Sequence, residues 1–104
     1  MTYRVEKWDR SDPPNASDLR ASVSAEGYSV FQWSDPPGAV YSQHQHSDTQ
    51  SHWIVSGTLE LTVEGAGTFV LEAGDRDLMP AGNLHSARVL GDKPVVYLIG
   101  SKID

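Results

Sequence analysis

The sequence predicts an all-β sandwich or barrel preceded by one short helix. Short runs rich in aromatic and β-branched residues recur at close, regular spacing, and Gly or Pro stands at each corner between them. The run at 59–64, LELTVE, alternates strictly between apolar and polar residues. This alternation predicts a half-buried strand with Leu59, Leu61 and Val63 on its inner face and the glutamates in water.

The N-terminal part has a different pattern. Residues 1–16 are polar and contain a Pro-Pro pair, so we expect an arm that lies over the domain. A short helix is predicted for Ser17–Glu26, where Asn15 or Ser17 can cap the first turn. Gly27 suits the left-handed residue that commonly follows a helix end.

Eight strands follow the helix, separated by turns rich in Gly and Pro. The predicted strands are Tyr28–Trp33, Ala39–Gln43, Gln50–Ser56, Thr58–Glu64, Thr68–Leu71, Arg76–Met79, His85–Leu90 and Val95–Ile99. A chain of 104 residues is long enough for one domain with one modest core. We therefore expect an arm and short helix over residues 1–27 and a β-barrel over residues 28–104.

Composition excludes several classes of function. Eight Lys and Arg against fourteen Asp and Glu give a net charge of −6, which disfavours nucleic acid and anionic membrane surfaces as partners. The chain has no Cys, so disulfides and thiolate metal sites are excluded. The start, MTYRVEKWDR, lacks the apolar stretch of a signal peptide, and no apolar run is long enough to span a bilayer. We expect a cytoplasmic protein.

The four histidines are the main candidates for chemistry. His44 and His46 are one residue apart, so on a strand both rings share a face at about 7 Å between Cα atoms. Gln50 and His52 share a face of the next predicted strand, and His85 follows a Pro-x-Gly turn. If all five side chains point into one small barrel, a bound metal would explain why polar groups occupy the interior.

These residues resemble the two motifs of the cupin family. The first motif corresponds to Gly38-x5-His44-x-His46-x3-Gln50-x6-Gly57, and the second to Gly74-x5-Pro80-x-Gly82-x2-His85. The resemblance implies a cupin, jelly-roll-like double-stranded β-barrel. It also implies one divalent transition metal per chain, held by His44, His46 and His85, with Gln50 as fourth ligand or spectator. Fe, Ni, Zn, Cu and Mn all suit such a site.

Gln50 stands where cupins usually have a glutamate ligand. A glutamine can ligate through its carbonyl oxygen but brings no charge, so the ion would keep a formal +2 where a glutamate would leave +1. We expect the cation to be held less tightly and to bind an anionic ligand more readily.

His52 lies outside the motif, on the same face as Gln50, and three roles are open. It can be a fifth metal ligand, a catalytic acid or base with an ordinary pKa near 6.5, or a packed histidine bonded to a neighbour.

Other residues are expected to be structural. The Asp75-Arg76-Asp77 segment is predicted to be a solvated corner with a local ion pair. Ile54, Met79 and Val89 are predicted to form the apolar wall of the pocket beside the metal. Trp33, Trp53 and Tyr97 are expected to be core or dimer contacts in preference to substrate-stacking residues.

Two classes of function follow from this interpretation. The first is a metal-dependent enzyme, dioxygenase-like or a lyase or isomerase, that acts on a small organic molecule inside the barrel. The second is a non-catalytic cupin module that binds a metal or a small ligand, and a barrel with a vacant site is the third possibility. The resemblance also implies a homodimer, for which Trp8, Phe31 and Trp53 are candidate contacts.

Overall fold

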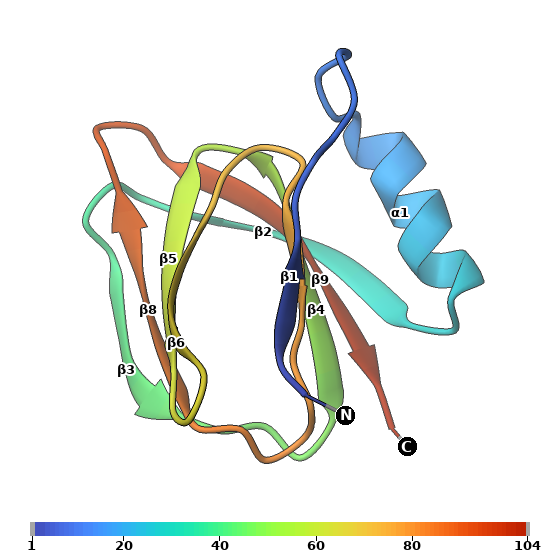
Figure 1. Cartoon of the computed structure of the whole chain (residues 1–104). Helices are drawn as coiled ribbons and strands as arrows, with labels where there is room; N and C mark the ends of the chain where they lie inside the picture. Colours follow the sequence, from blue (N-terminus) through green and yellow to red (C-terminus); the bar gives the residue numbers. More distant parts are fainter. Residues whose placement is uncertain (1, 104) are drawn as a thin grey trace.

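The computed structural model describes residues 2–103, so residues 1 and 104, the outer ends of the predicted ranges, lie outside it. Two antiparallel sheets face each other, and one helix lies outside them (Figure 1). The strand order is β1-β7-β4-β9-β2 in one sheet and β3-β8-β5-β6 in the other. The elements are β1 Arg4–Glu6, α1 Ala16–Ala25, β2 Ser29–Asp35, β3 Val40–His44, β4 Thr49–Ser56, β5 Thr58–Val63, β6 Gly67–Leu71, β7 Arg76–Leu78, β8 His85–Leu90 and β9 Val95–Lys102.

The all-β fold with one short helix is confirmed, and each of the eight predicted strands is present within a few residues of its predicted bounds. The longest extension is in β9, which continues past Ile99 to Lys102 because it pairs with β2 on one side and β4 on the other. The sequence did not predict β1. This three-residue strand pairs with β7, with Val5 opposite Asp77.

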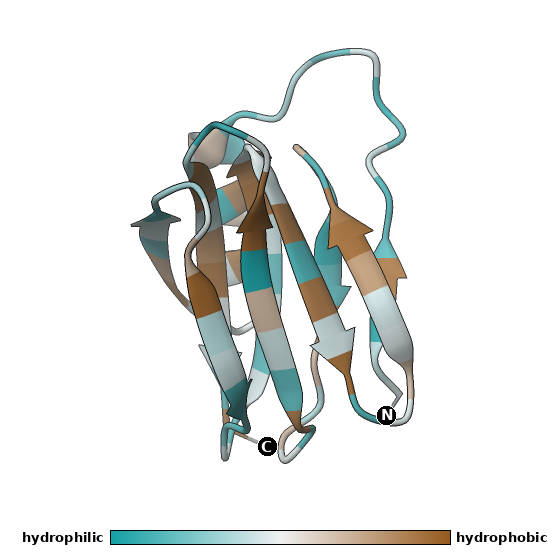
Figure 2. Cartoon of the chain, turned by 90° about the vertical axis from the view of Figure 1, so that its left-hand side faces the viewer, coloured by the Kyte–Doolittle hydropathy of each residue, from teal (hydrophilic) through white to brown (hydrophobic). Residues whose placement is uncertain are grey.

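The main core lies between the two sheets. Leu59, Leu61 and Val63 of β5 point inward and are almost fully buried, as their alternation predicted, whereas Glu64 is exposed. Figure 2 shows this alternation as bands of apolar and polar residues along the strands. Apolar side chains therefore pack together on the inner faces of both sheets, except at the histidines and their neighbours.

Helix α1 packs on the outer face of the five-stranded sheet. Its cap is Asn15, whose side chain accepts a hydrogen bond from the Asp18 backbone N–H at 3.1 Å. Val23 is buried against Tyr28 and Leu78. A Cβ atom at Gly100 would stand only 2.8 Å from Val23, so the absence of a side chain there allows the helix to approach β9.

The prediction of a solvated corner at Asp75-Arg76-Asp77 is wrong, because all three residues are buried. The Arg76 guanidinium forms a paired hydrogen bond with the carboxylate of Glu26, at 2.9 Å for both contacts. It also stacks on the Trp53 ring at 4.4 Å. Alternation along β7 sends Arg76 to the outer face, beside the helix, and Asp77 to the interior. A charged tripeptide usually marks a surface, and here each charge has its own partner.

Asp75 fastens the N-terminal arm to the barrel. Its carboxylate accepts hydrogen bonds from the backbone N–H groups of Trp8 at 2.8 Å and Glu72 at 2.9 Å, and from the Lys7 ammonium at 3.1 Å. Burial raises the pKa of Asp75, but these donors outweigh burial and hold the pKa below its ordinary value. The contribution of this group to stability is therefore present at neutral pH and is lost as pH falls through its lowered pKa.

We predict that Asp75→Asn lowers the free energy of unfolding by about 1–3 kcal/mol at neutral pH, because two or more charge-assisted hydrogen bonds are weakened. Urea titration followed by tryptophan fluorescence measures this difference. The gap between the two proteins should narrow below the ordinary pKa of aspartate, as the stabilising charge is lost on protonation. Asp92→Asn, at an exposed position in the β8–β9 turn, is the matched control. An equal loss in both variants would show that Asp75 does not anchor the arm.

Candidate metal centre and cavity

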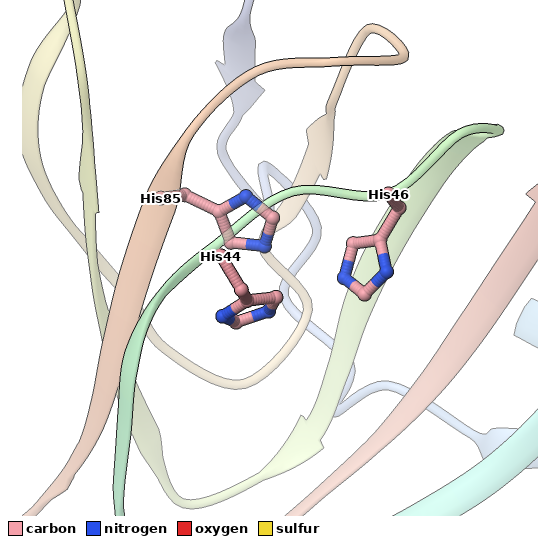
Figure 3. A group of neighbouring side chains, drawn as sticks. All are labelled: His44, His46 and His85. Carbon is pink, nitrogen blue, oxygen red and sulfur yellow. The ribbon is translucent and has the colours of Figure 1, made fainter.

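Three histidines meet between the two sheets. His44 ends β3, His46 follows it in the loop, and His85 begins β8 opposite His44. One ring nitrogen from each lies within 4.8 Å of the others, and the ring centroids are 4.3 to 5.2 Å apart. Figure 3 shows the three rings gathered around a common space. The motif spacing thus brings together the three residues predicted as ligands.

Backbone carbonyls orient two of these rings. Nδ1 of His44 lies 2.7 Å from the Ser42 carbonyl oxygen, and Nδ1 of His85 lies 2.9 Å from that of Asn83. An imidazole that donates from Nδ1 to a carbonyl has Nε2 free as a ligand atom, which is the usual arrangement in metal-binding histidines. Three imidazole nitrogens with two rings fixed in this way fit a divalent transition metal.

The turn before β8 holds His46 in place. The Gly82 backbone N–H donates to the His46 carbonyl at 2.8 Å, and Gly82 has φ of +82°, a conformation that a side chain disfavours. The Pro-x-Gly turn of the second motif therefore positions a histidine of the first motif as well as His85.

Burial and mutual repulsion lower the pKa of two of the rings. Burial lowers the pKa of His46, and the neighbouring charges of His44 and His52 lower it further against a smaller opposing effect of Asp48. Burial also lowers the pKa of His85, although its hydrogen bond to the Asn83 carbonyl partly opposes this. Neutral imidazoles are the form that binds metals.

Gln50 lies in the wall of the same cavity, next to the histidines. Its side-chain nitrogen donates to the Asp48 carboxylate at 3.3 Å, and Asp48 also accepts a hydrogen bond from the Ser101 hydroxyl. With the amide nitrogen bonded to Asp48, the carbonyl oxygen is the atom of Gln50 that can accept or ligate. Whether Gln50 ligates stays a prediction.

His52 forms a buried pair with Asp77. Its Nδ1 lies 3.0 Å from one carboxylate oxygen of Asp77, and its backbone N–H donates to the same oxygen at 2.7 Å. The other oxygen accepts the Tyr3 hydroxyl at 3.0 Å. Burial lowers the pKa of His52, but the charge of Asp77 and the hydrogen bond to it together outweigh burial and raise the pKa. No sequence pattern linked Asp77 or Tyr3 to His52, because both lie far from His52 along the chain.

A cavity of about 320 Å³ joins the three histidines to His52. Its wall is mostly apolar, as expected for a small-molecule site, but the predicted residues do not form it. Ile54, Met79 and Val89 are buried in the core between the sheets. The residues that line the cavity are Phe31, Trp33, Tyr41, His44, His46, Gln50, His52, Leu59, Leu61, His85, Ala87, Tyr97 and Ile99.

Trp33, Tyr41 and Tyr97 line the cavity and share one partner, the buried carboxylate of Asp35. The Tyr41 hydroxyl donates to it at 2.6 Å, the Tyr97 hydroxyl at 2.9 Å and the Trp33 indole N–H at 3.1 Å. Trp33 is 48% exposed and Tyr41 37% exposed, so they form the rim of the cavity. Trp33 and Tyr97, which were expected as core or dimer contacts, therefore also line the cavity.

The candidate dimer contacts have different surroundings. Phe31 is 49% exposed on β2, an edge strand, whereas Trp53 donates from its indole to the Gly74 carbonyl and lies under Arg76. Trp8 packs against Gly74. The homodimer stays a prediction.

No described helix is long and apolar enough to cross a membrane.

The Cupin domain family matches residues 31–100, and this match covers both sheets except β1, the start of β2 and the end of β9. The chain therefore belongs to the cupin domain family. No curated protein matches the chain.

Solved structures with the same fold include enzymes. The DMSP lyase DddQ from Ruegeria pomeroyi DSS-3 is 28% identical with a TM-score of 0.67, over 74% of this chain and 39% of the lyase. The oxalate decarboxylase from Lactobacillus farciminis, solved as a formate complex, is 25% identical with a TM-score of 0.66, over 73% of this chain and 24% of the decarboxylase. This chain thus spans well under half the length of either enzyme.

A protein of the DUF861 family from Thermotoga maritima matches along its entire length. The alignment covers 97% of this chain and 100% of the other, with 19% identity and a TM-score of 0.63. This likeness shows the fold alone.

We predict that metal-free protein binds one Zn²⁺ per chain and that His85→Ala weakens binding by more than about a hundredfold, since even outer partners of metal ligands are worth 10–100-fold. Isothermal titration calorimetry measures both. His52→Asn is the matched comparison, because His52 lines the cavity but lies outside the three-histidine cluster. The affinity of His52→Asn for Zn²⁺ should stay within about tenfold of wild type, a difference in binding free energy of about 1.4 kcal/mol. A loss as large as that of His85→Ala would make His52 a ligand.

Gln50→Glu is expected to tighten Zn²⁺ binding by about tenfold or more, because a carboxylate would lower the formal charge at the ion. Gln50→Met, similar in size without a ligating oxygen, is the control for packing. If Gln50→Glu and wild type bind equally well, the side chain at this position does not reach the ion.

Proposed function

We propose that this protein is a metal-dependent enzyme that transfers a proton on a small anionic molecule held in the barrel, in the manner of a lyase or isomerase. The observation that supports this most directly is the arrangement of two groups on one cavity: the three-histidine cluster and the His52–Asp77 pair. The first suits a metal ion, and the second suits a catalytic acid or base. The DMSP lyase among the related structures agrees with this class of chemistry.

A divalent metal bound by the histidines would supply Lewis-acid polarisation of a carboxylate or carbonyl oxygen of the substrate. The neutral ligand set favours an anionic substrate, because His44, His46 and His85 bring no negative charge to the ion. Leu59 and Leu61 belong to the apolar wall, which would keep water away from a molecule bound against it. The volume of about 320 Å³ restricts the substrate to a small molecule.

His52 would move the proton. Its Nδ1 is bonded to Asp77, so Nε2 is the nitrogen that can meet a substrate in the cavity. Nε2 would take a proton from the carbon next to the polarised group, and the C–H electron pair would form a double bond. In an elimination the leaving group then departs with the electron pair of its own bond, and in an isomerisation the proton returns at another atom. The substrate carries both the acidic C–H and the acceptor of the electrons, so no redox partner is needed.

The test is a screen of protein loaded with Zn²⁺, Fe²⁺, Mn²⁺ or Ni²⁺ against small carboxylates that include DMSP and oxalate, with β-diketones and thiols alongside. Proton NMR follows the compounds, and an oxygen electrode separates dioxygenase-like turnover from proton transfer. For a compound that is turned over, His52→Asn should lower kcat by about 10²- to 10⁴-fold, the usual worth of a general acid or base.

Metal content is measured in the same samples, so loss of the ion is separated from loss of the base. Tyr28→Phe, on the far side of the five-stranded sheet beside α1, is the control and should keep full activity. Turnover that survives in His52→Asn would remove His52 from the mechanism. Consumption of oxygen with turnover would replace proton transfer by the dioxygenase-like alternative.

The second candidate function is a binding module without turnover. The absence of a carboxylate from the described three-histidine cluster favours it, since that cluster contains no negatively charged ligand that could itself act as a base. In this case the compounds of the screen bind and leave unchanged.

Trp33 at the rim provides the measurement, because a ligand in the cavity should change its fluorescence. We predict that an anionic ligand quenches or shifts the emission of metal-loaded wild type and that the change disappears in Trp33→Phe. If a compound changes the fluorescence but NMR detects no product with any metal, the protein binds that compound without turnover. This outcome would support the binding module and exclude enzyme activity toward the compounds tested.

A further inference from the structure

The first strand of the chain reaches the functional cavity through a line of hydrogen bonds. Tyr3 lies immediately before β1, and its hydroxyl donates to one oxygen of Asp77 at 3.0 Å. The carboxylate of Asp77 in turn contacts Nδ1 of His52 at 3.0 and 3.1 Å through its two oxygens. The line therefore runs from the N-terminal arm, through β7, to a side chain that lines the cavity.

Each member of this line is fixed by packing. Asp77 is fully buried, and the His52 side chain is 9% exposed. The Tyr3 ring packs on Phe69 of β6, with ring centroids 5.0 Å apart, and Val5 pairs with Asp77 in the sheet. The His52 backbone N–H binds the same carboxylate as its ring. A carboxylate held by one backbone and two side-chain donors has little freedom to rotate.

This arrangement determines which nitrogen of His52 carries the hydrogen. A carboxylate accepts and does not donate, so the nitrogen that faces Asp77 has to be Nδ1–H. The neutral ring then has an unprotonated Nε2, the form that a base or a ligand requires. Without the carboxylate, the ring is free to place its hydrogen on Nε2 and to turn.

We propose that Tyr3 and Asp77 are positioning residues for His52, so that β1 and the residue before it complete the functional site. Tyr3 holds the carboxylate of Asp77, and Asp77 holds the His52 ring with Nε2 directed to the cavity. Tyr3 and β1 lie outside residues 31–100, the part of the chain that matches the cupin domain family. Tyr3 and β1 would thus contribute to the functional site as well as pack against the barrel.

The inference rests on the proposed role of His52, but its test needs neither substrate nor metal. The experiment is two-dimensional ¹H–¹⁵N NMR of the imidazole rings in metal-free, ¹⁵N-labelled protein at alkaline pH, where the rings are neutral. In wild type, His52 is expected as the Nδ1–H tautomer, with a low-field Nδ1–H signal that exchanges slowly because the bond is buried. A wild-type spectrum with His52 in the Nε2–H form would overturn the proposal without any variant.

Two variants test the line step by step. Asp77→Asn should abolish the low-field signal and move His52 toward the Nε2–H form. Tyr3→Phe should keep the Nδ1–H form but shift the signal and speed its exchange, because Asp77 loses one of its donors. Tyr28→Phe, a buried tyrosine on the outer face of the sheet, is the matched control and should leave the signal unchanged.

The possible failures can be told apart. If Tyr3→Phe and Tyr28→Phe give the same His52 signal as wild type, β1 does not position the ring and the inference fails. If Asp77→Asn does not fold, the wild-type tautomer and the Tyr3→Phe spectrum still decide the matter. If the tautomer responds as expected but no compound is turned over, the positioning line stands and only the proposed enzyme activity fails.

Discussion

The carboxylate of Asp77 is the group on which the barrel and its site depend together. It is fully buried, and a buried charge without partners costs several kcal/mol, so its surroundings have to supply donors. They come from the Tyr3 hydroxyl, the His52 backbone and the His52 ring. The requirement to satisfy one carboxylate therefore fixes the N-terminal segment, β7 and β4 relative to one another.

The two residues before Asp77 also connect separate parts of the fold. Asp75 accepts backbone donors from the arm and from the turn before β7, and Arg76 pairs with Glu26 at the end of the helix. Three consecutive charged residues thus connect the arm, the helix and the interior of the barrel. The short β7 carries little apolar surface of its own, and its polar contacts compensate for this.

Much of the fold and the centre of the site were predictable from the sequence, because both depend on local spacing. The alternation of 59–64 and the turn glycines specify strands, and the intervals between His44, His46 and His85 match the cupin motifs. β1 was not predictable: three residues carry too little pattern, and Val5 is in a strand only because β7 offers an edge. The partners of His52 could not be predicted either, since the contact between Tyr3 and Asp77 joins residues 74 positions apart.

Asp35 has a consequence for how ligand preference can change in this barrel. Its carboxylate bonds side chains from β2, β3 and β9, so it connects the edges of the two sheets at the rim. A substitution in the cavity wall alters one surface at a time, whereas a substitution of Asp35 releases three aromatic side chains together. A substitution of Asp35 should therefore change the entrance more than a substitution of any one of the three aromatic residues. Asp35 is not itself among the residues that line the cavity, so it would act on the entrance through these three side chains.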